Sequence, residues 1–197
     1  IQITRGSSGQ GYLPKGNSPT CVIETLPLFP VPDEPGSLWL SDWRRIPENA
    51  LPVRSKLCQG MNSTLARIQA QEHGCFDSLQ LNQQGIVCET SSANIFWSKQ
   101  NTLFTAALDC GVLEGATREI LCRLAQPVHT VHAGLDDLKA ADTVCITNVA
   151  WGVLPVSGLQ PDGTTWDSLK MAGKLTEILE HDRAEYCHAH AKEWQMA

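Results

Sequence analysis

The sequence lacks any long run of apolar residues, and it lacks an excess of positive charge. No stretch approaches the roughly 18 apolar residues that a membrane-spanning helix needs, so we expect no membrane span. The 15 Lys and Arg residues are outnumbered by 21 Asp and Glu residues, which gives a formal net charge of −6. Proteins that neutralise phosphates carry the opposite sign, so we expect no nucleic acid partner. Hydrophobic residues still make up 42% of the 197 residues, enough for a folded core.

Close cysteine pairs are also missing. None of the eight cysteines stands in a CxxC or CxH pair, which excludes a zinc ribbon or zinc finger. A chain this long and aliphatic does not need disulfides, and Cys88 and Cys145 lie in strand-like runs where free cysteine packs as a small hydrophobe. The histidines His181, His188 and His190 are more typical of exposed residues on a polar helix than of metal ligands. We therefore expect a reducing cytoplasm and no metal.

The sequence has neither an initiator Met nor a signal peptide. Its first residues, Ile1–Arg5, resemble an interior strand, so we expect the natural protein to extend further N-terminally. Residues 6–20 are rich in Gly, Ser and Pro, which is typical of a loop and linker.

The hydrophobic pattern of the remaining chain alternates between helices and short strands. Helical spacing of apolar residues predicts helices over 60–73, 116–125, 135–140 and 166–180. Short runs bounded by turn residues predict strands over 21–29, 78–81, 86–88, 94–97, 103–105 and 143–149. A meander of short strands between helices is typical of an α+β fold.

Three features could carry chemistry. Lys56 lies in the otherwise apolar or small segment VRSKLCQG, where a lysine can become a nucleophile or a Schiff-base amine, although most lysines are simply solvated. Glu89 ends the strand-like run GIVCE and could also be an ordinary strand-end carboxylate. The segment GVLEGATR begins a helix at Ala116 and Thr117, where backbone N–H groups, a hydroxyl and the helix dipole favour a phosphate, although an ordinary capped helix starts similarly. Together they are what a protein supplies to hold pyridoxal 5'-phosphate.

The motifs resemble those of the fold-type IV pyridoxal-phosphate enzymes from Ile1 to about Val156. Lys56 fits the catalytic lysine of the family, with Gln59 in place of its usual Asn. Residues 87–94 (VCETSSAN) match the ring-nitrogen motif, which contains Glu89, and 113–118 (LEGATR) match the phosphate-cup motif. The strand edge that faces the cofactor is matched by Thr147-Asn148-Val149.

This resemblance implies an organisation for the chain. Residues 1–13 would be the last strand and loop of a small N-terminal domain that is otherwise mostly absent, and 14–20 an interdomain linker. Residues 21–197 would be the large C-terminal, pyridoxal-phosphate-binding domain, an α+β pseudo-barrel of short strands with flanking helices. The cofactor contacts would come from Lys56, Glu89, Ala116, Thr117, Asn148 and Val149.

Within the family, the sequence is most similar to the 4-amino-4-deoxychorismate lyases. The segment Thr4–Tyr12 matches their glycine-rich loop, so Tyr12 and Gln10 would contact the substrate, with Gln10 in place of an Arg. The resemblance implies a cytoplasmic homodimer that converts 4-amino-4-deoxychorismate to 4-aminobenzoate and pyruvate in folate biosynthesis, with Lys56 as the catalytic residue. The alternatives are an aminotransferase acting on D- or branched-chain amino acids, and a non-catalytic remnant.

Overall fold

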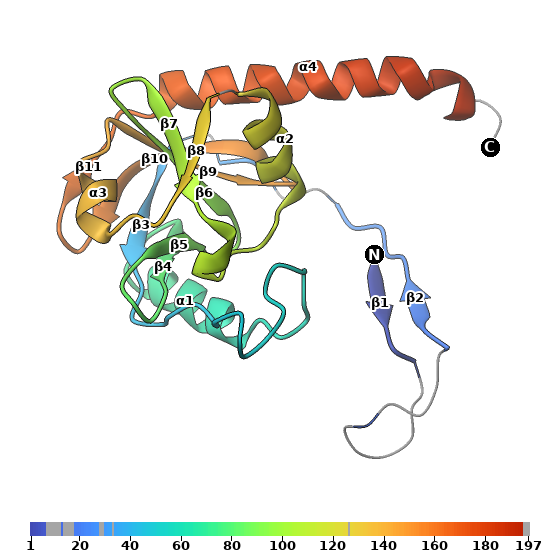
Figure 1. The fold of residues 1–197 in the computed structure, drawn as a ribbon, viewed down its shortest axis with the longest axis horizontal. Helices are drawn as coiled ribbons and strands as arrows, with labels where there is room; N and C mark the ends of the chain where they lie inside the picture. Colours follow the sequence, from blue (N-terminus) through green and yellow to red (C-terminus); the bar gives the residue numbers. More distant parts are fainter. Residues whose placement is uncertain (7–12, 14–17, 28–29, 33, 126, 195–197) are drawn as a thin grey trace. The chain divides into compact units, whose positions relative to one another are not determined.

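The computed structural model describes residues 1–6, 13, 18–27, 30–32, 34–125 and 127–194 (Figure 1). The chain forms two compact units, residues 1–30 and 31–197. In the first unit, strand β1 (Gln2–Thr4) pairs antiparallel with β2 (Thr20–Val22), so that Ile3 lies opposite Cys21. The first unit therefore extends past the linker expected over 14–20.

The second unit is built on one sheet of short strands. They are β3 (Gly36–Leu40), β4 (Asp77–Leu81), β5 (Val87–Thr90), β6 (Asn94–Lys99), β7 (Thr102–Ala106), β8 (Val128–Val131), β9 (Thr143–Asn148), β10 (Gly152–Gln160) and β11 (Thr164–Thr165). The hydrogen-bonded order is β11-β10-β3-β4-β5-β6-β7-β8, and β9 pairs with both β10 and β6. Strands β10, β3, β4, β5, β6 and β9 therefore close into a ring. This confirms the expected α+β pseudo-barrel.

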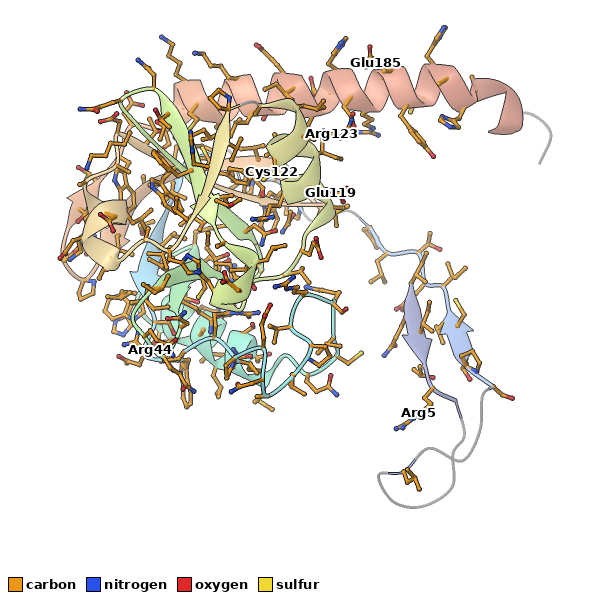
Figure 2. All side chains as sticks on the ribbon, viewed as in Figure 1. Arg5, Arg44, Glu119, Cys122, Arg123 and Glu185 are labelled. Carbon is orange, nitrogen blue, oxygen red and sulfur yellow. The ribbon has the colours of Figure 1, made fainter. Side chains whose placement is uncertain are left out.

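Helices cover the outside of this ring. They are α1 (Met61–Glu72), the 3₁₀ helix η1 (Leu108–Cys110), α2 (Ala116–Leu124), α3 (Leu135–Lys139) and α4 (Leu169–Trp194). Helix α1 packs against β4 and β3, whereas α2 and α4 pack against each other and against β9. Figure 2 shows Cys122 and Arg123 on α2 beside α4. There Arg123 Nη2 lies 3.0 Å from Asp182 Oδ1 of α4 and ties the two helices together.

Neighbouring residues of one strand contribute to different hydrophobic clusters because successive side chains point to opposite faces. Ile95 and Trp97 of β6 belong to the largest buried cluster, together with Ile146 of β9. Phe96 and Cys145, which face each other across the same two strands, belong to a second cluster with residues of α2 and α4. Both faces of β6 and β9 are therefore buried, and this fixes the strand ends that reach the site described below.

Most of the predicted elements are confirmed, and the errors have physical causes. The strand predicted over 21–29 is limited to β2, and the last helix begins at Leu169 and continues to Trp194. Strands β3, β8, β10 and β11 were not predicted. Pro155 and two glycines interrupt the pattern of β10, and such residues argue against a strand when only the sequence is read.

All eight cysteines are free. Cys88 and Cys145 are buried, as expected of small hydrophobes. Burial raises the pKa of Cys88 to about 12 and also raises that of Cys145, so both stay protonated at neutral pH. Among the described residues, no helix is long and apolar enough to cross a membrane.

Candidate active site

A cavity of about 610 Å³ opens at one end of the second unit. Four segments line it: the loop between β3 and α1, the turn from β5 to β6, the start of α2, and the end of β9. Six predicted site residues line the cavity together: Lys56, Glu89, Ala116, Thr117, Asn148 and Val149. The predicted substrate contacts Gln10 and Tyr12 lie outside the described residues.

Glu89 is the most heavily bonded group in the cavity. Its Oε1 lies 2.7 Å from Arg45 Nη2, and its Oε2 accepts hydrogen bonds from Asn94 Nδ2 at 2.8 Å and from the Leu113 backbone N–H at 3.0 Å. Burial raises the pKa of Glu89, while Arg45, the Leu113 N–H and the charge of Lys56 act in the opposite direction. The carboxylate is therefore held in one orientation by a cation and two N–H groups.

Arg45 and Leu113 were missed by sequence reasoning. Arg45 comes from the loop after β3, and its Nε also donates to the Gly111 carbonyl at 3.1 Å. The contact joins residues 66 positions apart, and no local pattern shows such a contact. Asn94 lies in the matched motif, but only its register opposite Glu89 reveals that it supports the carboxylate.

Lys56 lies on the loop that precedes α1, and its side chain is exposed. The apolar setting suggested by the flanking sequence is therefore absent around the side chain, because this loop consists of turns that face the cavity rather than the core. Lys56 still lies close enough to Glu89 for its charge to influence that carboxyl group. An exposed amine on a cavity wall can reach a bound molecule without being fixed by the protein.

The beginning of α2 presents backbone donors to the same cavity. Its N-cap residue is Gly115, and no side chain caps the helix. A Cβ atom on Gly115 would lie only 2.2 Å from Asn94 Oδ1, so only glycine fits there. The N–H groups of Ala116 and Thr117 therefore remain available to an anion, as the positive end of the helix dipole favours.

The end of β9 completes the wall. Thr147 is buried, and its Oγ1 has no hydrogen-bond partner among the described residues. Asn148 Nδ2 donates to the Ser92 carbonyl at 3.3 Å, and its Oδ1 accepts from the backbone N–H groups of Ala150 and Trp151. Asn148 therefore acts within the protein by joining the β9 end to the β5–β6 turn.

Asp77 anchors that turn from below. It is fully buried at the start of β4, where its carboxylate accepts hydrogen bonds from the Ser91 hydroxyl, from Ser92 Oγ at 2.7 Å and from the Ser78 backbone N–H at 2.7 Å. Arg67 Nη1 lies 3.5 Å away. Sequence reasoning missed this residue, because its two serine partners follow 14 and 15 positions later in the chain.

Removing this anchor should destabilise the protein. We expect Asp77→Ala to lower the free energy of unfolding by about 3–5 kcal/mol, because the buried serine hydroxyls and Arg67 lose a charged partner. Urea unfolding followed by circular dichroism measures the loss. The matched control is Asp162→Ala, which removes a partly exposed carboxylate paired with Lys139, and it should cause a much smaller loss. Equal losses would show that burial of Asp77 adds nothing.

The fold and cavity together define a class of protein. A closed ring of short strands presents a buried carboxylate, an accessible lysine and an uncapped helix start to one cavity, as expected of an enzyme that binds a phosphorylated cofactor. Residues 1–159 match the sequence profile of the family described as Amino-transferase class IV. The chain belongs to this family, which confirms the expected fold type.

The relatives carry two kinds of name. A Methanocaldococcus jannaschii protein provisionally named a branched-chain-amino-acid aminotransferase is 32% identical over 91% of this chain and 64% of its own length. Other curated relatives are named aminodeoxychorismate lyase. The chain therefore spans less than two thirds of the Methanocaldococcus protein.

Solved structures show the same division. A Legionella pneumophila protein provisionally described as a 4-amino-4-deoxychorismate lyase has a TM-score of 0.82 and 25% identity, covering 91% of this chain and 68% of that protein. A branched-chain aminotransferase of Thermoproteus uzoniensis, solved with norvaline, has a TM-score of 0.68 and 30% identity over 73% of this chain and 50% of its own. Other structures with this fold are described with pyridoxal 5'-phosphate bound. The expected cofactor is therefore confirmed at the level of the family.

Proposed function

We propose that the protein binds pyridoxal 5'-phosphate in this cavity and acts as a lyase that converts 4-amino-4-deoxychorismate to 4-aminobenzoate and pyruvate. The observation that carries the choice of reaction is the extent of the structural match. The Legionella protein covers 91% of the chain at a TM-score of 0.82, whereas the Thermoproteus aminotransferase covers 73% at 0.68.

The residues in the cavity fit the cofactor. The buried Thr147 Oγ1 lacks a partner within the described part of the chain, and the start of α2 has no side-chain cap. Both features leave polar groups that an anionic, hydrogen-bonding ligand can satisfy. The Ala116 and Thr117 N–H groups would hold the phosphate, and Glu89 would bind the ring nitrogen.

When bound, pyridoxal 5'-phosphate supplies an electron sink for the bonds beside the substrate amine. Glu89 holds the proton of the ring nitrogen, because its carboxylate is fixed by Arg45 and Asn94 and can accept that hydrogen bond. Lys56 Nζ removes a proton from the substrate ring and returns protons during product formation. Asp77 keeps the Ser91–Ser92 turn in place beside them.

An assay with both substrate classes tests the proposal. The full-length protein, supplied with pyridoxal 5'-phosphate, is mixed either with 4-amino-4-deoxychorismate or with branched-chain or D-amino acids plus 2-oxoglutarate. We expect pyruvate and 4-aminobenzoate in the first mixture, measured by a lactate dehydrogenase couple and by fluorescence. Glutamate formation in the second mixture without pyruvate in the first would support the aminotransferase and overturn the lyase. No product in either mixture would favour a non-catalytic remnant.

Gly115 provides a test of the phosphate position. We expect Gly115→Ala to weaken cofactor binding about tenfold, because the new methyl group displaces Asn94 at a cost of about 1–3 kcal/mol. Titration of the apoprotein with pyridoxal 5'-phosphate, followed by absorbance, measures the affinity. Gly173→Ala on α4 is the control, since a Cβ atom there meets nothing within 4 Å. Unchanged affinity in Gly115→Ala would place the phosphate elsewhere.

We also propose that the active protein is a homodimer and that Tyr12 and Gln10 contact the substrate. If Gln10 replaces a charged contact, Gln10→Arg should lower KM with little change in kcat. Sedimentation of the full-length protein measures its assembly, and an active monomer would contradict the dimer.

A further inference from the structure

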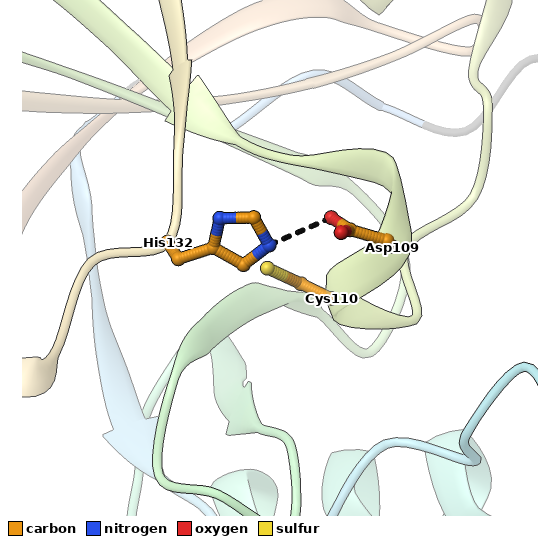
Figure 3. A group of neighbouring side chains, drawn as sticks. All are labelled: Asp109, Cys110 and His132. Carbon is orange, nitrogen blue, oxygen red and sulfur yellow. Dashed lines mark ion pairs between the residues drawn. The ribbon is translucent and has the colours of Figure 1, made fainter.

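Asp109, Cys110 and His132 gather outside the cavity that holds Lys56 and Glu89 (Figure 3). A carboxylate oxygen, a sulfur and an imidazole nitrogen of these residues all lie within 4.8 Å of one another. His132 Nε2 is 2.8 Å from Asp109 Oδ1. We propose that these three side chains form a binding site for one borderline-soft divalent cation of the Zn²⁺ or Co²⁺ type. The proposal does not depend on the reaction proposed above.

The sheet brings the three residues together. Strands β7 and β8 pair in parallel, with Ala106 opposite Val131, so both chains leave the sheet at the same edge. The Ala107 N–H extends this pairing by donating to the Val131 carbonyl at 3.0 Å. Asp109 and Cys110 follow one strand, and His132 follows the other. The ligands are thus placed by the fold, which explains why the spacing of the cysteines gave no sign of them.

The cradle is rigid where the sulfur lies and adjustable elsewhere. Cys110 is buried at 2% exposure and is fixed by the turn of η1, whose Cys110 N–H donates to the Ala107 carbonyl at 3.0 Å. The side chains of Asp109 and His132 are more than half exposed. Ligand bonds of about 2.0–2.3 Å bring donor atoms closer together than they are here, and these two side chains can turn to close the difference. A cation would therefore lie at the surface above a fixed sulfur.

The donor set limits which cation fits. A thiolate, an imidazole and a carboxylate suit Zn²⁺ or Co²⁺, whereas Mg²⁺ and Ca²⁺ prefer oxygen donors alone. Three protein ligands leave a fourth position of a tetrahedral ion for water. The site is therefore expected to exchange its ion with solvent rather than to enclose it.

A bound ion would also stiffen the back of the candidate active site. The Cys110 carbonyl accepts a hydrogen bond from Cys88 Sγ at 3.0 Å, and Cys88 is the neighbour of Glu89. The next carbonyl, that of Gly111, accepts from Arg45 Nε. The segment that carries two of the ligands is therefore the segment that supports the Arg45–Glu89 pair, so the ion would act there as a structural brace.

Cobalt titration of the full-length protein tests the site, with Co²⁺ as the only added metal. We expect one Co²⁺ per chain by equilibrium dialysis, a thiolate-to-cobalt charge-transfer band in the near ultraviolet, and a rise in Tm that Mg²⁺ does not cause. His132→Ala should weaken Co²⁺ binding about tenfold or more and remove the rise in Tm. Because His132 is exposed, this variant should fold normally, as circular dichroism can verify. Cys110→Ser should remove the charge-transfer band.

Two matched variants separate this site from chance binding. His181→Ala removes another exposed histidine that faces a carboxylate, that of Glu185 at 3.5 Å, and Cys21→Ser removes an exposed thiol. Both should bind Co²⁺ as the wild type does. The proposal is overturned if His132→Ala binds Co²⁺ unchanged, if the band disappears in Cys21→Ser instead, or if the wild type shows no thiolate band at all.

Discussion

Lys56→Ala is expected to lower kcat by a factor of about 10²–10⁴ or more while leaving the fold unchanged, since acid–base catalysis by one positioned group contributes about that much. Lys56 lines the cavity beside Glu89 but is exposed and belongs to no hydrophobic cluster. Its removal therefore leaves the packing intact. Steady-state kinetics with 4-amino-4-deoxychorismate and unfolding in urea would show the two effects separately.

The control for this experiment is Lys99→Ala, which removes an exposed lysine at the end of β6, away from the cavity lining. It should retain wild-type kcat. If Lys56 moves a proton, small primary amines added to Lys56→Ala should restore part of the activity, which a structural role would not allow. Retained activity and an unchanged cofactor absorbance in Lys56→Ala would remove this residue from the catalytic role.

The sequence predicts much of the second unit because its elements follow simple local rules. Helix α1 has apolar residues at helical spacing and ends before Gly74, which adopts the left-handed conformation (φ 69°). Strands β4 to β7 follow one another as a meander separated by turns, so each is visible in its own short window. By contrast, β3 and β10 lie far apart in the sequence and pair in parallel, and this contact stabilises strands whose local pattern is weak.

The same distinction applies to the cavity. The positions of Lys56, Glu89 and Thr117 follow from motifs that lie on separate segments, and the structure places all three on one cavity wall, although their roles stay predictions. What the sequence could not show are the groups that act through them. Arg45 and Asp77 contact their partners only after the ring of strands has closed. Long-range pairs of this kind depend on register, and register is set by the whole sheet.

Glu89 therefore has two functions that one substitution changes together. Its carboxylate would hold the ring nitrogen, and it also neutralises Arg45, whose side chain is only 10% exposed. In Glu89→Gln the amide NH₂ must face either Arg45 or the N–H groups of Asn94 and Leu113, so one donor always meets another donor. Breaking a buried pair in this way costs about 3–5 kcal/mol.

We accordingly expect Glu89→Gln to bind pyridoxal 5'-phosphate, to be less stable than the wild type, and to lose most of its kcat. A neutral amide cannot hold a proton on the ring nitrogen, so the electron sink is weakened. Arg45→Gln separates the two effects, because it also breaks the buried pair but keeps the Glu89 carboxylate. It should lose comparable stability in urea unfolding but a clearly smaller share of kcat. Equal losses of kcat in the two variants would mean that Glu89 supports the fold of the cavity rather than its chemistry, and a kcat of Glu89→Gln near that of the wild type would contradict both functions.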